Sequence, residues 1–149
     1  MKNLILNPHW RETEHGCPLY FSGKGAVLDD FYIGGYRTRS LTLPANGKTS
    51  AFDRYDKPIC VAGERVICWG YIIRSIHADS VHLCVEFYGK SGVLLHSARQ
   101  NIARRITYQF TQQAACFPIP KGAHTARLSI EFSGMLTACT FYAPTAYFC

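Results

Sequence analysis

Hydrophobic and polar residues alternate along residues 81–88 of this sequence. One set is Val81, Leu83, Val85 and Phe87, and the other is His82, Cys84, Glu86 and Tyr88. A β-strand turns successive side chains to opposite faces, so a period of two places each set on its own face. The segment therefore predicts a strand with one apolar face and one face that is polar and aromatic.

Residues 65–74 also predict a strand, but both of its faces carry apolar side chains. One face holds Val66, Cys68, Gly70 and Ile72, and the other holds Ile67, Trp69, Tyr71 and Ile73. If this strand shares a sheet with residues 81–88, Trp69 and Tyr71 join the polar face of its neighbour. Aromatic rings beside a few hydrogen-bonding groups are typical of a small-molecule site, and they suit a sugar.

Short apolar or alternating segments separated by turns recur along the whole chain. Further strands are predicted over residues 3–6, 19–21, 26–28, 36–43, 48–52, 57–61, 93–97, 106–111, 116–119, 126–132, 136–143 and 146–148. Asn46 and Gly47 form a strong turn dipeptide, and a helical turn fits residues 98–104. Many short strands with regular turns predict an all-β fold, an antiparallel β-sandwich of one domain over residues 1–149.

Composition and charge restrict the classes of function. The chain has 149 residues, 48% of them hydrophobic and 17% charged, which excludes a disordered chain. The net charge of +6 is spread over scattered lysines and arginines, so we expect no nucleic-acid partner. No apolar run approaches the length of a membrane span, so we expect no membrane partner. The first eight residues lack the pattern of a secretion signal, which favours cytoplasmic synthesis.

The seven cysteines show no zinc-site spacing. Their number is odd and no C-x-x-C pair occurs, so the interpretation favours free thiols over a disulfide framework. His82, Cys84 and Glu86 share one strand face, but neighbours there are about 6.5–7 Å apart, wide for ligands of one metal. We expect no metal site and no cofactor.

Four segments together resemble carbohydrate-binding modules of families 4 and 9 and their galactose-binding-like jelly-roll relatives. Residues 3–8 read Asn-Leu-Ile-Leu-Asn-Pro, similar to the start of many such modules. Residues 61–74 resemble the segment with a glycine and an aromatic strand that follows. The remaining two segments are the hairpin of residues 81–92 and the stretch of residues 117–132.

The resemblance implies a jelly-roll β-sandwich that binds glycans without catalysis. It places a core between the sheets, made of Val66, Cys68, Val81, Leu83, Val85, Phe87, Ala126, Leu128, Ile130 and Phe132. It places the glycan on the opposite face, against Trp69, Tyr71, His82, Glu86, Tyr88, Arg127 and Glu131. Family members often hold a structural calcium ion through an acidic C-terminal strand, but residues 141–144 carry no acid here. Similar modules occur in phage tail fibres, so a virion part that recognises a cell-surface polysaccharide is the predicted context.

Three alternatives remain open. Residues 8–35, or a second copy of the chain, could cover Trp69 and Tyr71 and turn them into core residues. The aromatic face could instead bind other virion subunits or form a homo-oligomer, since Trp, Tyr and Arg are enriched in protein interfaces. Glu86 and Glu131 could act as the carboxylate pair of a small glycoside hydrolase.

Trp10 is expected to plug one end of the sandwich.

Overall fold

The chain is almost entirely β-structure. The computed structural model describes residues 2–33 and 36–149, and among residues 31–37 it describes no side chains. The strands are β1 (Thr13–Glu14), β2 (Cys17–Pro18), β3 (Phe21–Lys24), β4 (Val27–Ile33), β5 (Tyr36–Cys60), β6 (Val66–Arg74), β7 (His77–Gly89), β8 (Leu94–Asn101), β9 (Thr111–Pro118) and β10 (Ala123–Phe148). A short 3-10 helix, η1 (Ala103–Arg105), follows β8 and agrees with the predicted helical turn. The described part of the chain contains no helix with the length and apolar character needed to cross a membrane.

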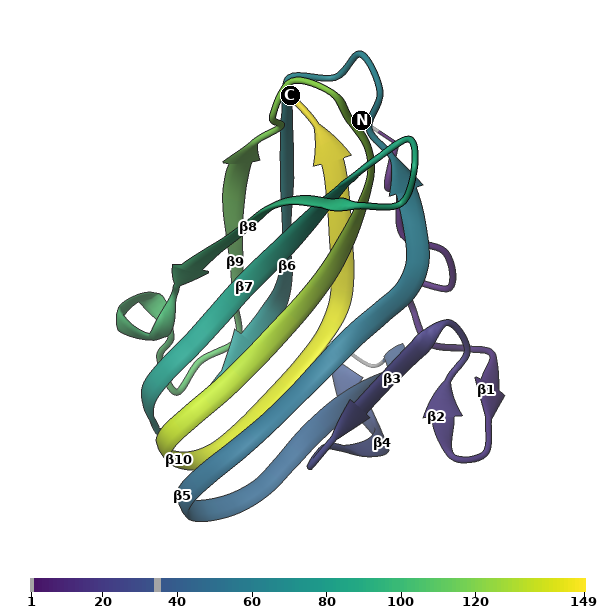
Figure 1. Ribbon diagram of the computed structural model, residues 1–149. Helices are drawn as coiled ribbons and strands as arrows, with labels where there is room; N and C mark the ends of the chain where they lie inside the picture. The colour runs from purple at the N-terminus through teal and green to yellow at the C-terminus, as the bar shows by residue number, and fades with distance from the viewer. Residues whose placement is uncertain (1, 34–35) are drawn as a thin grey trace.

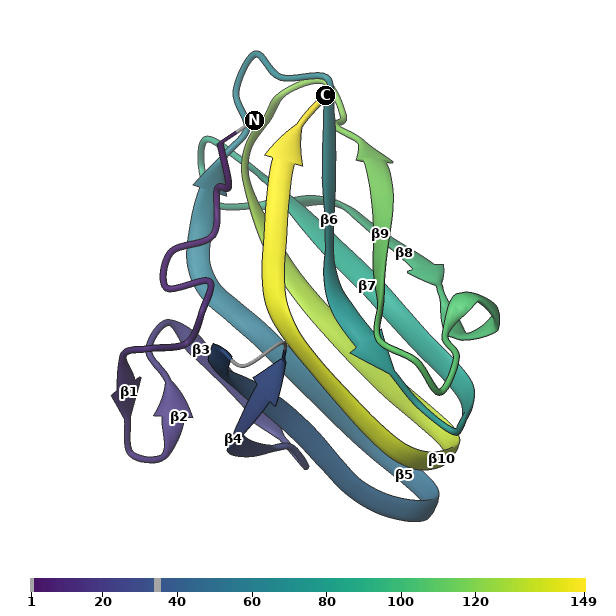
Figure 2. The same cartoon turned by 180° about the vertical axis from the view of Figure 1, so that it is seen from behind.

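Eight of the strands form one antiparallel sheet that folds over into two layers, which confirms the predicted β-sandwich. The front layer contains β3, the second half of β5, the first half of β10, β7 and β8. The back layer contains β4, the first half of β5, the second half of β10, β6 and β9. Figure 1 views the front layer, and Figure 2 shows the back layer from behind.

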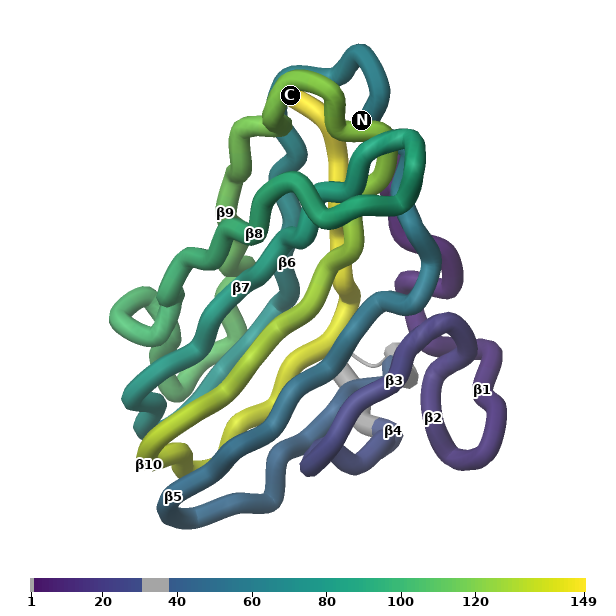
Figure 3. The backbone as a smooth tube through the Cα atoms, viewed as in Figure 1, coloured from purple at the N-terminus to yellow at the C-terminus, as the bar shows by residue number. Residues whose placement is uncertain are grey.

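Strands β5 and β10 each belong to both layers, because they bend at the same end of the sandwich (Figure 3). The predicted turn at Asn46 and Gly47 is therefore not a hairpin. Both residues stay in β5 and pair with Thr137 and Leu136 of β10. The pairing shifts register just beyond this point, between Thr137 and Cys139, and such a bulge sharpens the bend of a strand.

Several predicted strands merge or move. The segments predicted at residues 126–132, 136–143 and 146–148 are one strand, β10. The segments predicted at residues 36–43, 48–52 and 57–61 likewise merge into β5, except for residue 61, because β5 ends at Cys60. Residues 106–110 are not in a strand, because β9 begins only at Thr111. Residues 3–6 are not a strand either, although the Leu4 amide donates to the Ala146 carbonyl at 2.8 Å.

The core lies between the two layers, and β6 and β7 contribute to it from opposite sides. Strand β7 turns its alternating apolar set inward, as predicted, and each of those four side chains is fully buried. Strand β6 turns Ile67, Trp69, Tyr71 and Ile73 inward, all at most 1% exposed. The predicted core positions Val66 and Cys68 are on the other face of β6, so that part of the prediction is wrong.

The N-terminal region covers one end of this core. Trp10 is fully buried and contacts Phe21, Tyr71 and Phe141, with ring centroids 5.6–6.2 Å apart. This confirms Trp10 as a plug of the sandwich. Residues 34–35, at the end of this long segment, lie outside the described residues.

Candidate functional site

Five of the seven predicted glycan-binding residues lie together on the outer face of the front layer. They are His82, Glu86 and Tyr88 on β7, and Arg127 and Glu131 on β10. His82, Glu86 and Tyr88 are half-buried, whereas Arg127 and Glu131 are exposed. Alternation alone places them there, because their strand neighbours fill the core.

The two remaining residues, Trp69 and Tyr71, are not on this face. Both are 1% exposed and pack against each other at 5.5 Å in the core. The prediction is wrong because β6 and β7 are not in the same layer: β6 pairs with β9 and with the second half of β10, and β7 pairs with β8 and the first half. The face predicted to bind sugar on β6 is instead the inner face of the back layer.

The strand register arranges the outer face in rows that run across the front layer. In one row Ser97 of β8, Glu86 of β7 and Arg127 of β10 lie side by side. In the row nearer the end of β7, Tyr88 faces Thr125. Neighbouring rows on one face are two residues apart along each strand, about 6.5–7 Å, so a ligand the size of a sugar can contact two rows at once.

Two adjoining clefts hollow this face. The larger, of about 590 Å³, is lined by Arg54, Pro58, Glu86, Tyr88, Gly92, Thr125 and Arg127. The smaller, of about 300 Å³, is lined by Arg54, Cys84, Val85, Glu86, Ser97, Ala98, Arg99, Ser129 and Glu131. Because Arg54 and Glu86 line both, we treat the two clefts as one site and call it the outer groove. Each cleft falls within the usual size range of small-ligand sites, about 300–1,000 Å³.

Charged groups without protein partners are the main feature of the outer groove. Among the described residues, no ion pair or hydrogen bond is formed by the side chains of Glu86, Arg127 or Arg54. The Arg54 guanidinium lies 5.2 Å from the centre of the Phe52 ring. Arg99 and Glu131 form an exposed ion pair at 3.4 Å, which contributes little to stability. The groove thus offers unpaired donors and acceptors next to aromatic rings.

His82 and Cys84 on this face have shifted pKa values, and the shift of Cys84 argues against thiol chemistry. Partial burial, with help from the nearby Arg99 charge, lowers the pKa of His82, although Glu131 opposes the change. His82 is therefore neutral at pH 7 and can accept from or donate to a hydroxyl. Burial raises the pKa of Cys84 to about 11, so its thiol stays protonated and is a poor nucleophile.

The predicted pair of hydrolytic carboxylates is not brought together. Glu86 faces Arg127, whereas Glu131 faces His82, four residues further along β7. At about 3.3 Å per residue the Cα positions of the two glutamates are offset by roughly 13 Å along the strands, although both side chains line the smaller cleft. Retaining and inverting glycosidases need about 5–5.5 Å and 6.5–9.5 Å. The offset of the two backbone positions is larger than either separation.

Sequence reasoning missed Arg54 and Arg99 as groove residues, and with them Phe52, whose ring lies beside Arg54. Residues 51–55 alternate between buried Ala51, Asp53 and Tyr55 and the outward Phe52 and Arg54. These residues do alternate between inward and outward positions. The pattern is hard to recognise in the sequence because the central inward residue, Asp53, is a charged type that is normally exposed. Arg99 lies opposite Cys84 because β8 extends beyond the predicted residues 93–97 to Asn101.

A separate cleft of about 260 Å³ lies outside the outer groove, near β4 and β5, and is lined by His9, Arg11, Thr38 and Arg39. Arg39 is already engaged there: it pairs with Asp30 at 3.3 Å and donates to the Trp10 carbonyl oxygen. The described residues that line it include no Phe, Tyr or Trp. The outer groove is the better site for a sugar.

Comparison with solved structures places the fold among jelly-roll carbohydrate-binding modules. The chain superposes over its full length on TmCBM61, solved in complex with beta-1,4-galactotriose, with a TM-score of 0.60 and 11% identity, and it covers all of that chain. It is similar over 97% of its length to a family 4 module, CBM4, with a TM-score of 0.58 and 13% identity, and covers 99% of that chain. These similarities confirm the predicted jelly-roll β-sandwich.

A phage protein shares the fold as well. The chain is similar over 99% of its length to the enzymatically active domain of tailspike protein 4 of bacteriophage CBA120, with a TM-score of 0.68 and 14% identity. It spans only 21% of that tailspike chain. No family model matches the sequence, and no curated protein matches it.

Proposed function

We propose that the protein is a non-catalytic module that binds a glycan in the outer groove. The observation that carries the proposal is the placement of Glu86 and Arg127 beside the half-buried Tyr88 in one cleft, with no ion pair or hydrogen bond from either side chain to another described residue. Sugar hydroxyls accept from arginine and donate to carboxylates, and the C–H face of a sugar ring packs on an aromatic ring. The similarity to carbohydrate-binding modules supports this choice of ligand.

The context we propose is a phage or prophage virion, where the module recognises a cell-surface polysaccharide. The tailspike similarity supports it. A shallow groove of this kind gives weak binding at a single site, and display of several copies on one particle raises the overall affinity through multivalency.

A glycan array tests the proposal with four proteins: wild type, Tyr88→Ala, Arg127→Ala and Arg39→Ala. The two groove variants should lose the glycans that wild type binds. Arg39→Ala, in the separate cleft, is the matched control and should keep them. All four must show the same circular dichroism spectrum. The proposal fails if folded wild type binds no glycan, or if the groove variants bind as wild type does.

A second candidate function is contact with another protein through the β7–β8 hairpin. Three successive residues there, Val93, Leu94 and Leu95, are 60%, 48% and 46% exposed. Adjacent exposed apolar side chains at the edge of a sheet mark an interaction surface. Light scattering after size-exclusion chromatography tests a homo-oligomer: wild type should be larger than a monomer, and Leu94→Asp should return it to the monomer.

A further inference from the structure

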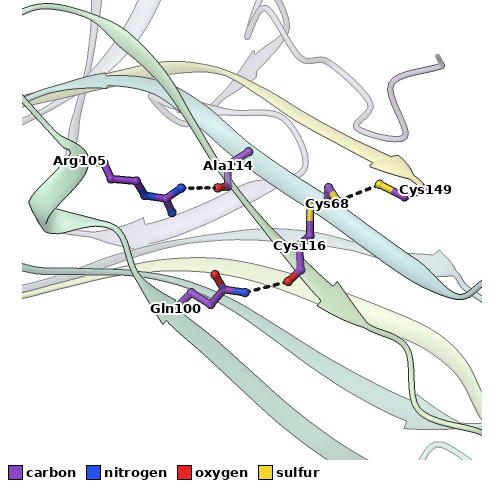
Figure 4. The surroundings of a disulfide bond; sticks show 6 residues. All are labelled: Cys68, Gln100, Arg105, Ala114, Cys116 and Cys149. Carbon is purple, nitrogen blue, oxygen red and sulfur yellow. Dashed lines mark hydrogen bonds between the residues drawn. A yellow bond between two sulfur atoms is a disulfide. The ribbon is translucent and has the colours of Figure 1, made fainter.

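Three cysteines that are far apart in the sequence meet on the outer face of the back layer. Cys68 lies on β6, Cys116 on β9, and Cys149 directly follows β10. Cys68 and Cys116 form a disulfide, which corrects the expectation of free thiols for these two residues. The Cys149 sulfur lies 2.9 Å from that of Cys68 (Figure 4).

The backbone holds these cysteines together independently of the disulfide. Cys68 and Cys116 are direct partners in the β6–β9 ladder. On the other side of β6 the ladder pairs Phe148 with Ile67, and the Cys149 amide continues it by donating to the Val66 carbonyl at 3.0 Å. The Gln100 side chain also donates to the Cys116 carbonyl at 2.7 Å. Breaking the sulfur–sulfur bond therefore leaves three thiols on adjacent strands.

The sulfur atoms are as close as the ligands of one metal ion. All three Sγ atoms lie within 4.8 Å of one another. Sulfurs that share a tetrahedral zinc ion, with Zn–S bonds of about 2.3 Å, are about 3.8 Å apart. Cys68 is fully buried, while Cys116 and Cys149 are exposed, so an ion can enter from solvent and a water molecule can complete its coordination.

The remaining cysteines do not compete for this role. Cys84 and Cys139 are buried singly, and burial raises the pKa of the Cys139 thiol to about 12. Cys17 and Cys60 are exposed, but among the described residues no second group of three histidine, cysteine or acidic side chains brings its ligand atoms equally close. Cys17 and Cys60 therefore serve as controls for substitutions in the three-cysteine cluster.

We propose that Cys68, Cys116 and Cys149 form a three-thiolate site for a soft divalent cation of the zinc type once the disulfide is reduced. A dithiol or phosphine reductant supplies two electrons, the bond between the Cys68 and Cys116 sulfurs breaks, and each sulfur takes a proton. Cation binding then releases the three thiol protons to solvent. A disulfide oxidant that accepts two electrons from the Cys68 and Cys116 thiolates re-forms the bond, is itself reduced to two thiols and leaves the ion without two of its three ligands, so metal content follows the redox state. The site does not depend on the glycan proposal, because the outer groove lies on the other layer.

Cobalt binding to reduced, folded protein tests this site. Protein treated with a phosphine reductant, desalted without oxygen and checked for its near-ultraviolet circular dichroism is titrated with Co²⁺. Wild type should take one equivalent and develop thiolate-to-cobalt charge-transfer absorption, and Zn²⁺ should abolish the band by displacement. Cys149→Ser should lose the band, whereas Cys17→Ser and Cys60→Ser should keep it.

Three outcomes overturn the proposal. One is a disulfide that the reductant does not open in the folded protein, measured by thiol titration. Another is reduced, folded wild type without a charge-transfer band. The third is a band of equal intensity in wild type and Cys149→Ser, which assigns the ion to other groups. Because Cys149 is exposed, its serine variant leaves the core packing unchanged.

Discussion

Arg127 lies directly opposite Glu86 on neighbouring strands, yet the two side chains form no ion pair. Opposite charges facing each other across an antiparallel pair normally attract. Here both charged ends remain open to the outer groove, next to Tyr88 and Arg54. In the glycan site that we propose, Arg127 is then available as a donor and Glu86 as an acceptor.

Arginine side chains should give the outer groove a preference for acidic sugars. Arg54, Arg99 and Arg127 outnumber Glu86 and Glu131, and only Arg99 is paired with a carboxylate. Calorimetry with a uronate oligosaccharide should show about tenfold weaker binding for Arg127→Ala, since a hydrogen bond to a charged group contributes about 1.5–3 kcal/mol. Added salt should weaken wild-type binding more than it weakens the variant.

Lys121→Ala is the matched control for that measurement, because Lys121 is an exposed cation in a turn that does not line the groove. It should bind like wild type. Equal weakening by both substitutions would show that net charge, rather than Arg127, sets the preference.

Replacing Trp69 should destabilise the fold. Trp69 is 1% exposed and packs on Tyr71, so Trp69→Ala should lower the free energy of unfolding by about 3–5 kcal/mol. Urea denaturation followed by circular dichroism measures this. Phe52→Ala, on the half-buried outer face, should cost clearly less. A loss for Trp69→Ala no greater than that for Phe52→Ala would contradict the assignment of Trp69 to the core.

Asp53 should make stability depend on pH. Burial, and secondarily the charge of Asp56, raises the pKa of Asp53 from 3.8 to about 8, and its Oδ2 atom has no hydrogen-bond partner. The folded state therefore holds a proton that the unfolded state releases, so between about pH 4 and pH 8 this group lowers the unfolding free energy as pH rises, by about 1.4 kcal/mol per pH unit. Below about pH 4 Asp53 does not lower the unfolding free energy, and above about pH 8 its full destabilising effect has been reached.

Asp53→Asn isolates this contribution, because the amide does not titrate. The unfolding free energy, measured in urea at about pH 5, 6, 7 and 8, should depend less on pH for the variant than for wild type. Parallel profiles would mean that Asp53 titrates normally in the folded protein.

Gly70 should tolerate no side chain. A Cβ atom at this position would collide with the Gln113 carbonyl oxygen and lie 2.6 Å from the Ala114 Cα, both backbone atoms of β9. Gly70→Ala should cost at least about 1–3 kcal/mol, the usual range for overpacking. Gly89→Ala is the control, because its Cβ would meet only the Leu95 side chain at an ordinary 3.6 Å. Thermal unfolding that lowers the melting temperature equally in both would contradict this packing.

The sequence by itself determined the class of fold and the two faces of β7 and of the first half of β10. In residues 81–88 and 126–132 the apolar and polar sets are clearly different, and alternation is a local property of a strand. The inward side chains of β7 and the outward Glu86, Tyr88, Arg127 and Glu131 could therefore be assigned before any pairing was known.

Only the tertiary structure decided which face of β6 is inside. Both of its sets are apolar, so alternation alone does not say which set faces the core, and the pairing of β6 with β9 and β10 settles its orientation. Long-range pairing likewise placed β6 and β7 in opposite layers, carried β5 and β10 through predicted turns, and brought Cys68, Cys116 and Cys149 together. These outcomes depend on contacts between residues far apart in the chain, which no local period encodes.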